Sequence, residues 1–277
     1  MWYWLFRILL IGPFLGLLSR PTVTGAEHIP RRGPVILASN HLAVSDSFFL
    51  VRLVPRKISF VAKREYFTGR GVRGRLVAWM FTAAGQVPVD RSGGAAAAGA
   101  LAAGARVLRA GGVWGVFPEG TRSPDGRLYR GRTGVARVAL ATGAPLVPVV
   151  ITGSAQVSPR GSRRWRRGRV HITVCEPLDV SRYRGALGPA GLETSGLPSM
   201  RQRAVVRAVT DEVMRVIAQH SPQEYVDRYA GDHRKAPGPD GGPTSLGGFG
   251  GVRPGAIGTS PTGPTGDPSV PPPPGTG

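Results

Sequence analysis

Two short segments of the chain carry side chains whose types and spacing suit one piece of chemistry. The first is Asn40-His41, which Asp46 follows after a gap of four residues; the second is 117–123, with the sequence Phe-Pro-Glu-Gly-Thr-Arg-Ser. An imidazole is poised to remove a hydroxyl proton near neutral pH, and a carboxylate can hold its other ring nitrogen. A guanidinium binds phosphate through two parallel hydrogen bonds. Together the segments indicate a general base beside a phosphate-binding loop, which suits acyl transfer onto a phosphate-bearing acceptor.

Each segment also has a simpler interpretation. A lone histidine such as His41 is more often a structural residue, and Asp46 is well placed to cap a helix that begins at Ser47. Glu-Gly-Thr-Arg can form an ordinary turn, and Arg122 can be a solvated surface charge in a chain this rich in arginine. The order and spacing of the segments, taken together, favour the chemical interpretation.

Two further segments complete a pattern. Residues 85–91, Gly-Gln-Val-Pro-Val-Asp-Arg, lie between the first two segments, and 147–153 follow them. With all four in order between about 23 and 178, the chain resembles the glycerolipid acyltransferase family, whose best-known members are the 1-acylglycerol-3-phosphate acyltransferases. One departure is Ala43, where many relatives carry a hydroxyl residue. The residues expected to do chemistry are all present.

The resemblance supports catalytic roles for His41 and Asp46. His41 is the expected base, and Asp46 is expected to hold the imidazole and stabilise its charged form, with the substrate hydroxyl in the place that serine takes in a Ser-His-Asp triad. Backbone N–H groups around Gly120 are candidates for binding the oxyanion of the tetrahedral intermediate.

Substrate binding is expected to involve the segments 85–91 and 117–123. The resemblance gives acceptor-binding roles to Arg91 and to the block Glu119, Gly120, Thr121 and Arg122. A carboxylate beside a phosphate repels it, so Glu119 is expected to orient Arg122 or to contact an acceptor hydroxyl. Lys63, just beyond an apolar run at 58–62, is a further candidate.

The implied activity is transfer of a fatty acyl group from acyl-CoA or acyl carrier protein to the free hydroxyl of 1-acylglycerol-3-phosphate, giving phosphatidic acid for phospholipid biosynthesis. Glycerol 3-phosphate, another lysophospholipid or a glycolipid are alternative acceptors. The chain has no Gly-x-Ser-x-Gly elbow, so no acyl-enzyme intermediate is expected. It has no Cys/His cluster, so neither a metal nor a cofactor is expected.

A net charge of +20 implies a negatively charged partner, such as anionic lipid, phosphorylated substrate or nucleic acid. It leaves open a second class, a non-catalytic basic protein that binds membrane or nucleic acid. The body shows no nucleic-acid-binding module, and its arginines are not interleaved with several stacking aromatics, so no nucleic-acid partner is expected. The run 160–169 holds six arginines around Trp165 and is expected to dock on an anionic membrane. Alternatively, this run binds the nucleotide of coenzyme A or is only a solvated loop.

The chain divides into three expected regions. Residues 1–19 are apolar but are interrupted at Gly12-Pro13 and are marginal against the ~20 residues of a spanning helix, so they are expected to enter one leaflet as two short segments. A buried packing helix is the alternative. Residues 20–235 form the acyltransferase domain, and 236–277, rich in Gly and Pro, form a disordered tail. The apolar N-terminus and the basic run lead us to expect a membrane-associated protein. The lone Cys175 cannot form an internal disulfide, so we expect the active site to face the cytoplasm.

Apolar runs alternate with helical patterns along the body, which predicts an α/β fold with a mostly parallel central sheet flanked by helices. In such sheets function gathers at the carboxyl ends of the strands, and each charged segment follows a predicted strand. The expected strands are 35–38, 58–62, 86–89, 113–117, 146–151 and 170–175. The expected helices are 46–54, 75–84, 95–110, 133–142 and 199–219.

Overall fold

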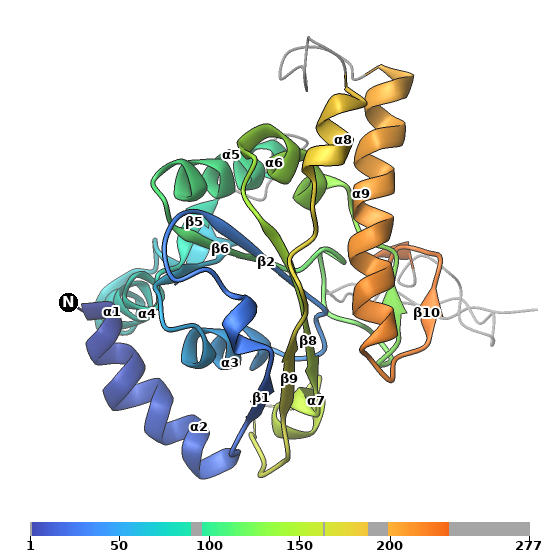
Figure 1. Ribbon diagram of the computed structural model, residues 1–277. Coiled ribbons are helices and arrows are strands. Elements are labelled where there is room, and N and C mark those ends of the chain that lie inside the picture. The colour runs from blue at the N-terminus through green and yellow to red at the C-terminus, as the bar shows by residue number, and fades with distance from the viewer. Residues whose placement is uncertain (1, 90–95, 163, 188–198, 233–277) are drawn as a thin grey trace, which may run out of the picture. The chain divides into compact units, whose positions relative to one another are not determined.

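A six-stranded sheet forms the centre of the fold, in the order β1-β9-β8-β2-β6-β3 (Figure 1). The structure, a computed structural model, describes residues 2–89, 96–162, 164–187 and 199–232, so the predicted tail at 236–277 lies outside it. Neighbouring strands of the sheet run parallel, except that β8 and β9 are antiparallel. The expected α/β fold with a mostly parallel sheet is confirmed. The strands are β1 (Thr22–Thr24), β2 (Val35–Ser39), β3 (Ile58–Ser59), β6 (Val113–Val116), β8 (Leu146–Thr152) and β9 (His171–Val174).

The strand β2 shows why helices cover both faces of the sheet. All of its residues are buried; Val35 and Leu37 pack into the core on one face, and Ile36 and Ala38 into the core on the other. A strand that is apolar on both sides must be enclosed between two layers. The first face is covered by α3 (Asp46–Leu53) and the N-terminal helices, and the second by α5 (Ala96–Arg109), α6 (Gly134–Thr142) and α9 (Met200–Gln219) (Figure 1).

The long helix α9 starts where its capping residues place it. The hydroxyl of Ser199 accepts a hydrogen bond from the N–H of Gln202 at 3.2 Å, and the Gln202 side chain accepts one from the N–H of Ser199 at 3.0 Å. This reciprocal pair is a capping box, which satisfies two N–H groups that have no partner within the helix. The shorter helices are α4 (Gly71–Ala83), α7 (Ser154–Val157), α8 (Ser181–Gly185) and 3₁₀ turns at Ala26–His28 and Arg64–Tyr66.

Two small parallel sheets lie beside the central one. One pairs β4 (Val61–Lys63) with β5 (Val87–Val89), and the other pairs β7 (Leu128–Tyr129) with β10 (Tyr225–Val226). The single strand expected at 58–62 is therefore wrong, because β3 belongs to the central sheet and β4 to a small one. The chain leaves the central sheet at Phe60, whose carbonyl accepts the N–H of Val87 at 2.8 Å.

The N-terminal segment stays helical through Gly12 and Pro13, so the expected interruption there is wrong. It consists of α1 (Trp2–Leu5), a π-helical stretch (Phe6–Ile11) and α2 (Gly12–Leu18). The N–H of Gly12 donates to the carbonyl of Arg7, five residues earlier. The wider π turn leaves room for the ring of Pro13, which an α-helical turn would press against a carbonyl of the preceding turn.

One side of this segment packs on the body and the other is exposed. Tyr3, Phe6, Ile11 and Leu15 are buried in the core that also holds α3, so the packing-helix interpretation is correct for this side. The opposite side exposes a set of large apolar residues: Trp4, Leu5, Ile8, Leu9, Leu10, Phe14 and Leu17. Across the described ranges, no helix is both long enough and apolar enough to cross a membrane.

Candidate active site

The loops that follow β2, β6 and β8 meet at one edge of the central sheet, because β2 lies between the other two strands. The N–H of Ser123 donates to the carbonyl of His41 at 2.8 Å, which joins the first two loops. Asn40 joins the first loop to the third. Its Nδ2 donates to the carbonyl of Ile151 and its Oδ1 accepts the N–H of the same residue, both at 2.8 Å. Two of the chemical segments singled out in the sequence thus lie side by side.

His41 and Asp46 make the contact that their spacing suggests. Nδ1 of His41 lies 2.9 Å from Oδ2 of Asp46; the Asp46 side chain is fully buried, whereas 18% of the His41 side chain is exposed. Because Nδ1 faces the carboxylate, Nε2 is the ring nitrogen left to accept a proton from a substrate. The pair therefore has the orientation that a general base needs.

Asp46 is the first residue of α3, yet its carboxylate does not cap that helix. Oδ2 accepts the backbone N–H of Leu42 at 2.7 Å and that of Ala43 at 2.8 Å, both in the preceding loop. A capping carboxylate accepts N–H groups from the first turn of its own helix instead. The loop wraps around the carboxylate and fixes it toward His41. The departure at Ala43 leaves this contact intact, because the contact uses the backbone.

An aromatic ring covers one face of the imidazole. The rings of His41 and Phe117 are stacked, with centroids 3.8 Å apart and planes 10° from parallel. Phe60 stacks behind Phe117 at 5.6 Å between centroids. The site loop after β6 thus contributes an aromatic wall as well as its charged residues.

Glu119 is completely buried and ties the two loops together. Its Oε1 accepts the N–H of His41 and its Oε2 accepts the N–H of Tyr129, both at 3.0 Å. Burial raises the pKa of the Glu119 carboxyl to about 7, the two backbone hydrogen bonds oppose the rise, and the nearby Asp46 carboxylate adds to it. With both oxygens engaged by backbone groups, Glu119 positions the loop of His41. Among the described residues, Glu119 forms no hydrogen bond or ion pair with Arg122, the first of the two contacts expected from the sequence.

The rest of the second segment forms a turn, and the side chain of Arg160 binds two of its carbonyl groups. The N–H of Gly120 donates to the carbonyl of Phe117 at 2.9 Å, and Gly120 has a φ of 75°, which favours glycine. Thr121 and Arg122 follow as partly exposed residues. Nη1 of Arg160 donates to the carbonyl of Arg122 at 3.2 Å and to the next carbonyl at 2.8 Å. Within the described part of the chain, no hydrogen bond or ion pair engages the guanidinium of Arg122, so it is available to an anion.

Of the two remaining candidates, Arg91 falls outside the described residues. Lys63 ends β4, and the register of the pairing places it opposite Val89 of β5. The backbone of Lys63 therefore lies beside the segment 85–91. As for metals, no three His, Cys, Asp or Glu side chains of the described residues gather as a metal site requires.

Comparison with known proteins places this geometry in context. A family model described as Acyltransferase matches residues 20–152. In a solved structure, the 1-acyl-sn-glycerophosphate (LPA) acyltransferase PlsC of Thermotoga maritima superposes with a TM-score of 0.57 at 26% identity, over 78% of this chain and 79% of that one. These matches support the glycerolipid acyltransferase family for this chain.

Curated relatives agree with this family. The 1-acyl-sn-glycerol-3-phosphate acyltransferase of Limnanthes alba is 32% identical over 159 residues, which are 57% of this chain and 54% of the relative. The alpha form of the same enzyme from Homo sapiens is 29% identical over 224 residues, 80% of this chain and 71% of the relative. The chain spans about half the length of the plant relatives that it matches.

Several supporting residues of the site received no role from the sequence. Asn40 and Phe117 stand next to residues that did, and Arg160 opens the arginine run, so position alone gave some signal for these three. Gln223 gave none. It is 183 residues from Asn40, yet its Oε1 accepts from Nδ2 of Asn40 at 2.6 Å. A contact of this separation becomes visible only once the chain has folded.

Proposed function

We propose that the protein transfers a fatty acyl group from an acyl thioester to the free hydroxyl of 1-acylglycerol-3-phosphate, giving phosphatidic acid. The proposal is carried by the 2.9 Å contact of His41 with Asp46, in a chain whose Glu119 loop is bonded to the backbone of His41. The names of the relatives, which are 1-acyl-sn-glycerol-3-phosphate acyltransferases, support this acceptor. The donor is acyl-CoA or acyl carrier protein.

The reaction forms an ester C–O bond and breaks the thioester C–S bond. Nε2 of His41 takes the proton of the acceptor hydroxyl as the oxygen attacks the thioester carbonyl, and Asp46 stabilises the imidazolium that results. Collapse of the tetrahedral intermediate expels the thiolate, which takes the proton back from His41. The base is thus restored at the end of each cycle, and no residue of the protein becomes acylated.

The acceptor phosphate binds to cationic side chains of the segments 85–91 and 117–123. Arg122 directly precedes Ser123, whose N–H is bonded to the carbonyl of His41, and no described residue forms a hydrogen bond or ion pair with the guanidinium of Arg122. A guanidinium recognises phosphate in a bidentate manner, which fixes the orientation of the acceptor as well as its position. Arg91 and Lys63 complete this clamp in our proposal, with Gly120 and Thr121 shaping the turn. Glu119 contributes by holding the loop.

The protein meets its lipid through one apolar surface, which we call the docking surface. It combines the exposed side of α1, the π-helical stretch and α2 with α4. The ring of Phe6 lies edge-on to that of Trp79 at 6.2 Å, which joins the two parts. A contiguous exposed apolar area of this kind marks a binding surface, and aromatic residues favour the headgroup boundary. On α4 it exposes Val72, Leu76 and Trp79.

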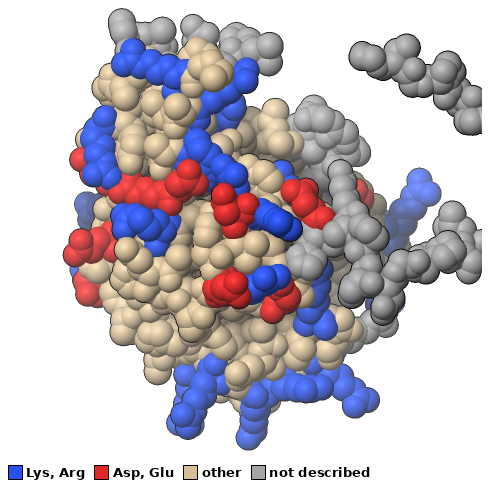
Figure 2. All heavy atoms as spheres, turned by 90° about the vertical axis from the view of Figure 1, so that its right-hand side faces the viewer, with Lys and Arg blue, Asp and Glu red and all other residues tan. Residues whose placement is uncertain are grey.

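Basic residues border the docking surface. Trp165, within the arginine run 160–169, packs on Phe14 of α2 at 5.2 Å, and the N–H of Gly168 donates to the carbonyl of Leu18 at 3.1 Å. Figure 2 shows basic side chains at the upper and lower ends of one face, with acidic and basic ones mixed between them; in Figure 1 the lower end is where α7 lies. Each basic residue near an anionic surface contributes about 1 kcal/mol of attraction.

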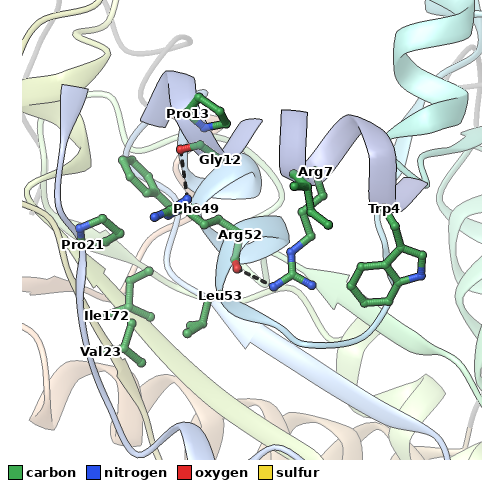
Figure 3. A pocket seen from close by; sticks show the side chains of 11 residues that line it. Trp4, Arg7, Gly12, Pro13, Pro21, Val23, Phe49, Arg52, Leu53 and Ile172 are labelled. Atoms are coloured by element: carbon green, nitrogen blue, oxygen red, sulfur yellow. Dashed lines mark hydrogen bonds between the residues drawn. The ribbon is translucent and has the colours of Figure 1, made fainter. Parts of the chain in front are cut away.

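Two arginines fix the N-terminal helices to α3. Nη2 of Arg7 donates to the carbonyl of Arg52 at 2.8 Å, and Nη1 of Arg52 donates to the carbonyl of Gly12 at 2.9 Å (Figure 3). These contacts border an open hollow of about 730 Å³ that includes Phe49 and Ile172 in its lining. The helices are therefore held at a defined angle, which sets how the body lies on a membrane. We place the active site on the cytoplasmic side, in keeping with the free Cys175.

The test is an acyl-transfer assay with purified full-length protein, one long-chain acyl-CoA and a panel of acceptors. We expect the highest kcat/KM for 1-acylglycerol-3-phosphate. A higher value for glycerol 3-phosphate, another lysophospholipid or a glycolipid would reassign the acceptor. Binding to anionic vesicles or to nucleic acid without any transfer would instead favour a non-catalytic basic protein.

A further inference from the structure

A segment far from His41 in the sequence forms hydrogen bonds with the loops that hold this residue. Residues 221–232, here called the C-terminal strap, follow α9 and include β10, which pairs with β7 (Figure 1). The strap lies beyond residues 20–152, which the family model matches.

Gln223 bridges two loops of the site. Its Oε1 accepts from Nδ2 of Asn40 at 2.6 Å, and its Nε2 donates to the carbonyl of Gly126 at 2.7 Å. The hydroxyl of Ser221 also donates to Oε1, at 3.3 Å, and accepts the N–H of Gln223 at 3.1 Å. Asn40 directly precedes His41, and Gly126 follows the Glu119 turn. One amide side chain therefore connects the first chemical segment, at Asn40, to the loop that follows the second, at Gly126.

The orientation of the two amides follows from the backbone. Ile151 offers Asn40 one N–H and one carbonyl, so Oδ1 of Asn40 must face the former and Nδ2 the latter. The second N–H of Nδ2 then points to the strap and needs an acceptor, because Asn40 is completely buried. Oε1 of Gln223 is that acceptor. Its Nε2 is left to donate to Gly126, which is the bond observed.

A second series of hydrogen bonds connects the C-terminal strap to His41. The N–H of Leu128 donates to the carbonyl of Glu224 at 2.9 Å, at the start of the β7–β10 pairing. The next residue of β7, Tyr129, gives its N–H to Glu119, and Glu119 accepts the N–H of His41. The strap thus supports His41 from both sides, through Asn40 and through Glu119.

We propose that Gln223 is a positioning residue for His41, through which the C-terminal strap sets the geometry of the catalytic loop. The inference rests on the proposed function insofar as it concerns turnover. Loss of the bridge leaves a buried N–H of Asn40 without an acceptor and frees the His41 loop from the Gly126 loop. His41 then spends less time aligned with the acceptor hydroxyl. Substrate affinity is unaffected, because the hydrogen-bond partners of Gln223 among the described residues are Asn40, Ser221 and Gly126, none of which is proposed to bind substrate.

The first test compares Gln223→Ala with Gln219→Ala, a control on the exposed end of α9, where the side chain bonds only Arg215 among the described residues. We expect Gln223→Ala to lower kcat by about 10- to 100-fold, the scale of a small misplacement of a catalytic group, with little change in acceptor KM. The control should match the parent. A folded Gln223→Ala protein with parental kcat, or with a change in KM alone, would overturn the proposal.

A second variant separates positioning from a general structural role. The carboxyl group in Gln223→Glu can accept from Asn40 but can donate to the carbonyl of Gly126 only when protonated. The ratio of its kcat to that of the parent should therefore rise as the pH is lowered. A ratio that does not depend on pH would contradict the bridge.

Hydrogen exchange provides a readout that needs no substrate. In Gln223→Ala, the backbone amides of residues 40–43 should exchange faster than in the parent, while those in the middle of α9 remain protected. Unchanged exchange at 40–43 would overturn the inference even if the acceptor proposed above were wrong. Absence of acyl transfer by the parent protein would count against the proposed function alone.

Discussion

The backbone N–H of His41 donates to Oε1 of Glu119 at 3.0 Å, so the predicted base and the carboxylate of the second segment are joined through the main chain. The contact explains why a carboxylate belongs in a loop proposed to bind phosphate. Both carboxylate oxygens of Glu119 accept backbone N–H groups, and one of these bonds holds the loop that carries the imidazole. The two segments therefore form one hydrogen-bonded unit.

Replacing His41 with Ala should lower kcat by ~10²–10⁴, the loss expected when a general base is removed. Thermal stability should change little, because the side chain is partly exposed and its partner Asp46 keeps two backbone donors. Steady-state assays and thermal melts check both points, with His220→Ala, an exposed histidine at the end of α9, as the matched control. Near-parental turnover by a folded His41→Ala protein would refute the mechanism.

Asp46→Asn and Asp46→Ala should differ in stability as well as activity. The amide oxygen of the Asn variant can still accept the N–H groups of Leu42 and Ala43, whereas Ala leaves both buried without an acceptor, at a cost of ~1–3 kcal/mol each. Both variants should lose activity, because neither stabilises an imidazolium by charge. Urea unfolding measures the difference, and equal stabilities would argue against the wrapped loop.

Glu119 should give the protein a pH-dependent stability. Because burial raises the pKa of its carboxyl from 4.5 to about 7, the folded state binds more protons than the unfolded state between these values. The free energy of unfolding should therefore fall as the pH rises through this window, by up to about 3 kcal/mol, and level off above it. Urea unfolding at several pH values, compared with Glu119→Gln, isolates this contribution. Parallel curves for the two proteins would show that Glu119 does not titrate as described.

Arg122→Ala should mainly raise the acceptor KM, by about 10- to 100-fold, because a charge-assisted bond to phosphate is worth ~1.5–3 kcal/mol and exists before the chemical step. Lys should rescue only in part, since it lacks the planar fork. We expect the same pattern for Arg91→Ala. Kinetics with a phosphate-bearing acceptor and its dephosphorylated analogue check this, with the exposed Arg109→Ala as control. Unaltered discrimination by both variants would exclude these arginines from the clamp.

Membrane binding should divide into an apolar part and a salt-sensitive part. Replacing Leu9, Leu17 and Val72 with Gln removes exposed apolar groups and leaves the buried side of the N-terminal helices intact, so the folded protein should bind anionic vesicles weakly and lose that binding in high salt. Neutralising Arg164, Arg166 and Arg167 should preserve binding in high salt. Vesicle flotation across a salt series measures both effects. Met200→Gln, exposed on α9, is the control, and unchanged salt-independent flotation of the apolar variant would place the docking surface elsewhere.

The elements that the sequence predicted well are those with a strong local signal. Four strands of the central sheet (β2, β6, β8 and β9) and five helices (α3, α4, α5, α6 and α9) lie within a few residues of their predicted places, because buried strands read as apolar runs and helices as periodic patterns. The division of 58–62 escaped detection because both halves are equally apolar and only their pairing partners differ. The continuous helix at Gly12 and Pro13 escaped it because a π turn depends on backbone packing.

The candidate site shows the same division. His41 and Asp46 are close in sequence, so their contact could be predicted from spacing, whereas the inward direction of Glu119 could not. Its acceptor role, toward two N–H groups that are 88 positions apart in the chain, His41 and Tyr129, exists only in the folded protein. The bridge through Gln223 depends on the same kind of long-range contact.

The stacking of Phe117 on His41 has an electrostatic consequence for the catalytic cycle. The face of a phenyl ring carries partial negative charge, so it attracts a cation held above it, by ~0.5–2 kcal/mol depending on exposure. Neutral imidazole gains little from this quadrupole, whereas the imidazolium formed during proton transfer gains both from it and from Asp46. The carboxylate lies at one edge of the imidazole and the phenyl ring lies parallel to it at 3.8 Å, so both contacts favour the same placement of the ring. We therefore expect Phe117→Leu to destabilise protonated His41 more than neutral His41. The protonated form exists between removal of the proton from the acceptor hydroxyl and its transfer to the thiolate.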